Sequence, residues 1–181
     1  MQSKTSQSTS ELLSGLIVSV VIQVETGDGQ KIVTIRSPLQ VNNHFPISMD
    51  LLCKKEDQLS CVTTIQPDSV FSVPLILAHK AALYLRPAGF GYGASTTPLL
   101  WNKLASEGYS LVQCPPPGGE GPPFHIAVDC EQVSYSAVHG SLEHAPNYVL
   151  HIYPTAVLHN YLPYNILYST PITSNTEVPL T

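Results

Sequence analysis

The sequence predicts an all-β fold, an antiparallel β-sandwich, and three observations support this prediction. Short apolar segments recur at a spacing of roughly 8 to 12 residues between turn-forming residues, which is typical of sandwiches and barrels. The 181 residues include 16 prolines, about 9% against a usual ~5%. Only 12% of the residues are charged, about half of the typical ~25%. Many prolines and few charges disfavour long helices, and the length fits one domain.

The predicted strands follow one another along most of the chain. Phe124, Ile126 and Val128 alternate with His125 and Ala127, so that one face of this segment is apolar. This period of two indicates a sheet with one face on a core. The predicted strands cover residues 32–35, 47–53, 59–65, 70–77, 82–85, 109–113, 124–130, 133–138, 148–153 and 164–168.

One short helix is predicted over residues 99–107. Leu100 and Leu104 lie four residues apart, and Gly108 is placed to end the helix. The glycine-rich segment 89–93 is too short for a phosphate-binding G-x-G-x-x-G motif and follows no βαβ pattern, so we interpret it as a flexible turn.

Charge and hydropathy argue against several classes of function. Eight Lys and Arg against 13 Asp and Glu give a net charge of 8 − 13 = −5, without a basic cluster, which argues against a nucleic-acid partner. The longest apolar run, 16–24, is shorter than the ~20 residues that a membrane-spanning helix needs. The polar N-terminus lacks the order of a secretory signal, so we expect a disordered tail over 1–14 and a cytoplasmic protein.

Cysteines and histidines do not form a recognisable catalytic or metal motif. The four cysteines include no Cys-x-x-Cys pair, which predicts free thiols. His125 and His151 occupy alternating strand positions, but neither a carboxylate motif nor an HExxH spacing accompanies them. A hydrolase built on Cys114 or Cys130 with His125 lacks a nucleophile motif. We therefore expect no catalytic residue, no metal and no cofactor.

An internal repeat is the most informative feature of the sequence. Residues 32–51 align without a gap on residues 149–168, at a constant offset of 117. The alignment matches Asn43 with Asn160 and Pro46 with Pro163. Because proline fixes φ and suits the first position of a strand, each copy is interpreted as two strands joined by a rigid bend. We interpret the two asparagines as structural clamps, whose carboxamides pair backbone groups at the bend.

The same residues identify a family. The sequence resembles a repeat of the adaptor-binding domain of the vacuolar protein sorting thirteen family, whose members are bridge-like lipid-transfer proteins at organelle contact sites. The residues that carry this resemblance are 35–39, 41, 43, 45–47, 65–67, 73–75, 83, 85–87 and 101. The resemblance implies a chain of β-sandwich repeats, each with a signature asparagine, here Asn43 and Asn160.

The resemblance covers about residues 30–170 and implies a domain organisation. We expect one β-sandwich repeat over 15–145, with its core at about 30–145, then the opening strands of a second repeat over 146–170 and a polar tail over 171–181. The chain is too short for a lipid-conducting groove or a full set of repeats, so we expect a fragment or splice product of a longer protein.

The resemblance also implies a function, the recruitment of a lipid-transfer protein to organelle membranes through short Pro-x-Pro peptides of adaptor proteins. An unpaired edge strand would take up such a peptide by main-chain hydrogen bonding. Tyr148, Tyr153, Tyr161 and Tyr164 are the candidates for peptide contacts, because tyrosine is apolar with one polar tip. Membrane association would then be indirect and peripheral.

Two alternatives remain open. A structural spacer would hold neighbouring repeats in register and bind no ligand of its own. A membrane-docking sandwich would bind lipid directly, but the one pair of adjacent lysines, Lys54 and Lys55, is followed at once by Glu56 and Asp57. Neighbouring repeats of the parent chain are expected partners in either case.

Overall fold

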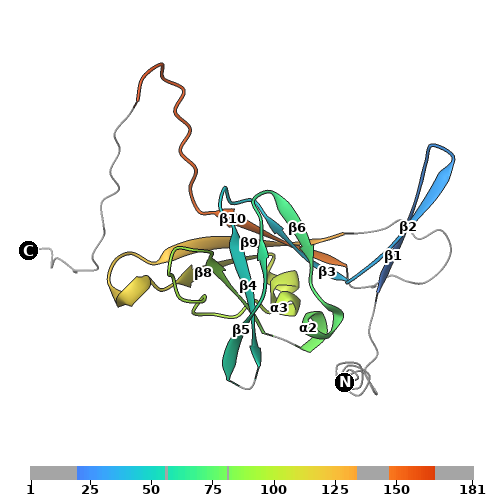
Figure 1. Ribbon diagram of the computed structural model, residues 1–181, viewed down its shortest axis with the longest axis horizontal. Helices are drawn as coiled ribbons and strands as arrows, with labels where there is room; N and C mark the ends of the chain where they lie inside the picture. The colour runs from blue at the N-terminus through green and yellow to red at the C-terminus, as the bar shows by residue number, and fades with distance from the viewer. Residues whose placement is uncertain (1–19, 56, 81, 134–146, 166–181) are drawn as a thin grey trace, which may run out of the picture.

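The computed structural model describes residues 20–55, 57–80, 82–133 and 147–165. Strands dominate these residues, which confirms the predicted all-β fold (Figure 1). The strands are β1 Val21–Gly27, β2 Gln30–Arg36, β3 Leu39–Asn43, β4 Met49–Lys55, β5 Gln58–Ile65, β6 Ser69–Ser72, β7 Leu83–Pro87, β8 Tyr109–Cys114, β9 Phe124–Gln132 and β10 Tyr148–Pro154. The helices are α2 Leu75–Lys80, α3 Trp101–Glu107 and the 3₁₀ turn η1 Pro117–Gly119.

Two sheets enclose the core. The larger sheet has the strand order β6-β3-β10-β9-β8, and the smaller one has the order β5-β4-β7. Both sheets contribute apolar side chains to one buried cluster, so the two layers form a sandwich. The fully buried strand residues of this cluster include Leu39, Val41, Met49, Leu51, Leu83, Leu85, Ile126, Val128, Leu150 and Ile152.

The central strand of the larger sheet comes from the C-terminal part of the chain. Strand β10 runs antiparallel to β9 and parallel to β3, with Leu150 beside Val41 and Ile152 beside Asn43. The sandwich is therefore mixed, and not wholly antiparallel as the sequence predicts. The expected boundary near residue 146 also differs from the structure, because β10 completes the sheet of the first sandwich.

Strands β1 and β2 form a separate two-stranded ribbon, which projects from the sandwich (Figure 1). A tight turn at Asp28 and Gly29, with φ of 50° and 75°, joins the two strands. The expected repeat core includes β2, whereas the structure leaves it outside the sandwich. Strand β1 is absent from the predicted strands, because residues 16–24 form one apolar run without a clear period of two.

The helices differ in how well the sequence predicts them. The short helix predicted at 99–107 is confirmed as α3, which ends where Gly108, with φ of 77°, donates its N–H to Leu104 O. The predicted strand 70–77 is wrong in its second half. The carbonyl of Pro74 accepts hydrogen bonds from Leu77 and Ala78 and starts α2.

Some expectations concern residues outside the described part of the chain. They are the polar tails 1–14 and 171–181, most of the predicted strand 133–138 and most of the predicted strand 164–168. Within the described residues, no helix has the length and apolar character to cross a membrane.

Candidate functional site

Asn43 lies at the end of β3, fully buried between the two sheets. Its Nδ2 lies 2.9 Å from the Ile47 carbonyl and 3.1 Å from the carbonyls of Ile65 and Gln66. Its Oδ1 accepts a hydrogen bond from the N–H of Phe45 at 3.0 Å. One side chain thus joins the bend at Pro46 to the end of β5, which is the geometry that a clamp requires.

Asn160 has the same local geometry at the offset of 117 residues. Its Nδ2 donates to the Tyr164 carbonyl at 2.9 Å, and its Oδ1 accepts from the N–H of Leu162 at 3.0 Å. These two bonds enclose Pro163 as the equivalent bonds of Asn43 enclose Pro46. The surroundings differ, because Asn160 and its partners are exposed.

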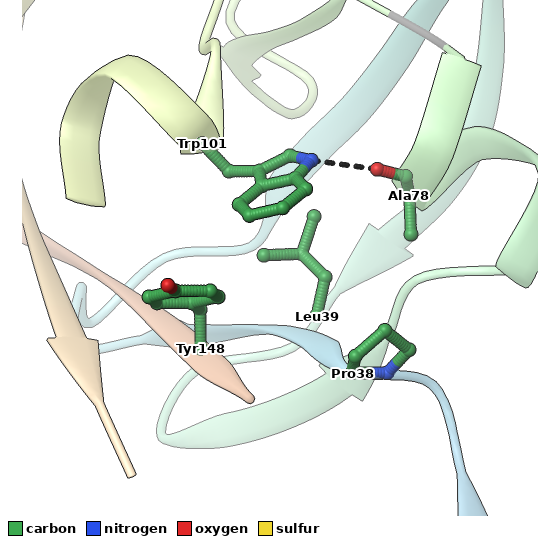
Figure 2. Close-up of a pocket in the computed structure, with 5 residues that line it drawn as sticks. All are labelled: Pro38, Leu39, Ala78, Trp101 and Tyr148. Atoms are coloured by element: carbon green, nitrogen blue, oxygen red, sulfur yellow. Dashed lines mark hydrogen bonds between the residues drawn. The ribbon is translucent and has the colours of Figure 1, made fainter. Parts of the chain in front are cut away.

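Tyr148 is half-buried and packs against the core of the sandwich, beside the start of α3. Its ring lies 5.2 Å from that of Trp101, whose Nε1 donates to the Ala78 carbonyl at 2.6 Å (Figure 2). Together with Pro38 and Leu39, these residues line an apolar hollow that is too narrow for a water molecule. The contacts between these residues hold α2 and α3 against the sheet, and the hollow between them has no space for a peptide side chain.

The other three candidate tyrosines lie elsewhere. Tyr153 is five residues from Tyr148 on β10 and therefore faces the opposite side of the sheet. Tyr161 and Tyr164 lie beyond β10 in an exposed segment, with Tyr161 90% exposed. The structure does not bring the four tyrosines together into one pocket.

The outer face of the larger sheet carries a histidine pair that the sequence did not predict. His44 Nε2 lies 2.9 Å from His151 Nδ1, and His151 Nε2 lies 3.0 Å from a Glu131 carboxylate oxygen. The ring of Tyr153 stacks on His44 at 4.4 Å. When the proton of His151 lies on Nε2, facing the carboxylate, His151 Nδ1 accepts a hydrogen bond from His44 Nε2.

Burial lowers the pKa of His44, the nearby His151 lowers it further, and Asp68 opposes the shift. The sequence suggests that His151 could face His125, but the register places His125 opposite Gln113 on β8. The parallel pairing of β3 with β10 brings His44 to His151, and no local sequence signal marks that pairing. Within the described ranges, no three His, Cys, Asp or Glu residues gather as a metal site.

The cysteines considered as nucleophiles are in unsuitable surroundings. Burial raises the pKa of Cys114 to about 11, and burial with the nearby Asp129 raises that of Cys130 to about 11. Thiols with such a pKa stay protonated near neutral pH, and the protonated thiol is a poor nucleophile.

Strand β5 offers the longest free edge among the described strands. It has eight residues, no charge and no proline, and it pairs only with β4. Natural proteins usually protect such edges with charges, proline, short length or a covering segment. The edge strand β6 has four residues, and neighbouring backbone covers part of β7 and β8 through Ser95, Leu99 and Thr96.

Two apolar side chains lie on one face of this edge. Leu59 and Cys61 are two residues apart and exposed, so they point to the same side of the sheet. The pairing shifts between Leu51–Thr63 and Leu52–Cys61, which leaves Val62 as a bulge and ends the regular run at Cys61. At the tip of the hairpin, Lys54 and Asp57 form an exposed ion pair, 2.8 Å apart.

The chain is similar to proteins of known family. Residues 4–178 match the family model of the vacuolar-sorting associated protein 13, adaptor binding domain. The chain is 33% identical over 169 residues to the intermembrane lipid transfer protein VPS13C of Mus musculus, covering 88% of the chain and 4% of that protein. The corresponding protein of Homo sapiens is 31% identical over 169 residues, with the same coverage.

A third relative, the intermembrane lipid transfer protein VPS13A of Mus musculus, is 28% identical over 170 residues, covering 92% of the chain and 5% of that protein. The chain thus spans a small part of the length of these relatives. The matches confirm the resemblance seen in the sequence, and the family description names adaptor binding. The chain belongs to the family of the vacuolar-sorting associated protein 13 adaptor binding domain.

Proposed function

We propose that this chain binds Pro-x-Pro peptides of adaptor proteins along the edge of β5. The family description supports an interaction domain. The observation that carries the proposal is the eight-residue, uncharged edge of β5, which pairs only with β4 among the described strands. Such an edge takes up an extended peptide as an added strand.

A Pro-x-Pro peptide suits an edge for a geometric reason. In an extended chain, successive backbone N–H and C=O groups point to opposite sides, so residues i and i+2 point the same way. The backbone groups of both prolines, which lack an N–H, then point away from β5, while the backbone N–H and C=O of the residue between them pair with β5. No hydrogen bond is lost by the placement of the prolines.

The side chains of β5 provide the matching contacts. Two prolines separated by one residue place their rings on the same face of the added strand. Leu59 and Cys61 have the same spacing and share one face, with Leu59 48% exposed. Each ring would cover one of these side chains, and removal of that apolar area from water would favour binding.

This function places the chain at membranes through its partners. The relatives are named as intermembrane lipid transfer proteins, and the chain spans 4% to 5% of their length. We propose that the parent protein transfers lipid and that this domain recruits it, as a cytoplasmic and peripheral protein, to an organelle membrane that carries the adaptor. Lipid docking is less favoured, because Lys54 is paired with Asp57.

Calorimetric titration with a panel of short Pro-x-Pro peptides tests the proposal. We expect saturable binding that is lost when both prolines are replaced by alanine. Leu59→Lys should weaken binding by at least about tenfold, equivalent to ~1.4 kcal/mol. Leu111→Lys, at a similarly exposed position on β8, an edge strand of the larger sheet, is the matched control and should leave the affinity unchanged.

Each other outcome has a definite meaning. Saturable binding that Leu59→Lys leaves intact would place the peptide elsewhere on the chain and reject the β5 site. Absence of binding by the folded chain to any member of the panel would favour the structural spacer.

A further inference from the structure

The β1–β2 ribbon corresponds, pair by pair, to the β9–β10 hairpin of the sandwich. At the offset of 117 residues, Ile35 of β2 is equivalent to Ile152 of β10. Ile35 pairs with Ile22 on β1, and Ile152 pairs with Val128 on β9. Two positions along, Val33 with Val24 corresponds to Leu150 with Cys130. Both hairpins are antiparallel, and the same strand positions are apolar in both.

The two hairpins differ in what covers them. Leu150 and Ile152 are fully buried in the sandwich core, whereas their equivalents Val33 and Ile35 are 57% and 67% exposed. Val128 is fully buried, and its equivalent Ile22 is 62% exposed. An isolated two-stranded ribbon is marginally stable, and a continuous apolar face on one is unusual without a partner.

The β9–β10 hairpin shows what kind of partner fits. It lies between two strands of its sheet, with β3 parallel to β10 on one side and β8 antiparallel to β9 on the other. A matching site for the ribbon is a sandwich that has the equivalents of β3 and β8 but lacks its own last hairpin. A second copy of this chain does not offer that site, because its own β9 and β10 fill it.

The other end of the sandwich repeats the arrangement. After β10 the chain continues into 155–165, where Leu158 and Leu162 are exposed. Their equivalents in the complete sandwich, Val41 and Phe45, are buried. After β10, which is buried in one sandwich, the chain enters residues that are equivalent to β3, the first strand of a sandwich. This order is the same as the order of β2 and β3 at the start of the chain.

We propose that the β1–β2 ribbon is the closing hairpin of a second sandwich of the same fold, in which β2 lies between strands as β10 does here. Neighbouring sandwiches are then interlocked, because each receives its central strand from the chain segment that opens the next. The interface buries Ile22, Val33 and Ile35. This inference is independent of peptide binding at β5.

A strand exchange within the full chain tests whether β2 fits the position of β10. Residues 149–153 are replaced by the sequence of residues 32–36, which includes Leu150→Val and leaves Ile152 and Tyr148 unchanged. The control uses the sequence of residues 33–37, shifted by one position, which includes Leu150→Thr and Ile152→Arg. We expect a cooperative thermal transition for the first variant and none for the second. Loss of the transition in both would overturn the inference.

A fusion protein tests the interlock itself. A copy of residues 37–123, which lacks β9 and β10, is placed directly ahead of residue 18 of the chain. In the control, the copy is 37–154 and keeps its own hairpin. Amide exchange of β2 should slow by at least about 100-fold in the first fusion and stay unchanged in the control. Unchanged exchange of β2 in the first fusion would overturn the inference.

Discussion

His44 and His151 share a hydrogen bond of 2.9 Å across two parallel strands, although 107 residues separate them in the sequence. Burial and the neighbouring His151 lower the pKa of His44 below its usual 6.5, while Asp68 opposes the shift. The neutral form of His44 is therefore the form that the folded sandwich prefers.

The lowered pKa of His44 predicts a pH dependence of stability. The unfolded chain binds a proton at His44 more readily than the folded chain, so the free energy of unfolding falls as pH decreases through 6.5 towards the lower folded pKa. The contribution is fully present above the unfolded pKa. Urea unfolding at a series of pH values measures it. His44→Gln should flatten this part of the profile, and an unchanged slope in that variant would assign it to another group.

The two asparagine clamps should differ in their effect on stability. Asn43→Ala leaves the buried backbone groups that it joins without a partner and should lower the free energy of unfolding by roughly 1 to 3 kcal/mol. Asn160→Ala, with the same local bonds in exposed surroundings, should change it by less than about 0.5 kcal/mol. Urea unfolding of both variants checks this. Equal effects would show that burial does not set the contribution of the clamp.

Ile152 and Ile35 are a second pair of equivalent residues that should differ in their effect on stability, because only Ile152 lies in the core. Ile152→Ala should lower the free energy of unfolding by about 2 to 5 kcal/mol, because it removes a fully buried side chain from the core. Ile35→Ala, at the equivalent and exposed position of β2, should change it by less than about 0.5 kcal/mol. Chemical denaturation of the two variants measures the difference. A small effect of Ile152→Ala would mean that β10 is not held in the sheet.

The contacts of Trp101 with Tyr148 and the Ala78 carbonyl give another stability prediction. Trp101→Phe keeps an aromatic ring beside Tyr148 but removes the donor to the Ala78 carbonyl, so we expect a loss of about 1 kcal/mol. Thermal unfolding monitored by circular dichroism checks this. Tyr109→Phe, which removes one hydroxyl from an exposed residue, is a control that should leave the transition unchanged.

Local patterns in the sequence predict much of the fold. Alternating apolar residues mark β9, and the spacing of Leu100 and Leu104 before Gly108 marks α3. The asparagine-proline spacing marks both bends, and the structure places matching hydrogen bonds at Asn43 and Asn160. These features depend on residues that are close together in the sequence, so they can be predicted from one sequence.

These local patterns do not predict which distant strands pair with one another. The offset of 117 residues relates β2 to β10, but it does not say which sandwich each strand completes. The contact between His44 and His151 follows from the parallel pairing of β3 with β10. Strand-edge geometry likewise determines which of the apolar residues, such as Leu59, remain available to a ligand.

The central position of β10 also determines the order in which the sheet can form. Among the described strands, β3 with β6 and β9 with β8 make two separate pairs that have no direct hydrogen-bonded connection until β10 lies between them. A ribosome synthesises β10 after all the other strands of the sandwich, so the five-stranded sheet stays divided until its residues have left the exit tunnel. Closure then requires contacts between distant parts of the chain, which makes this a slow step of folding.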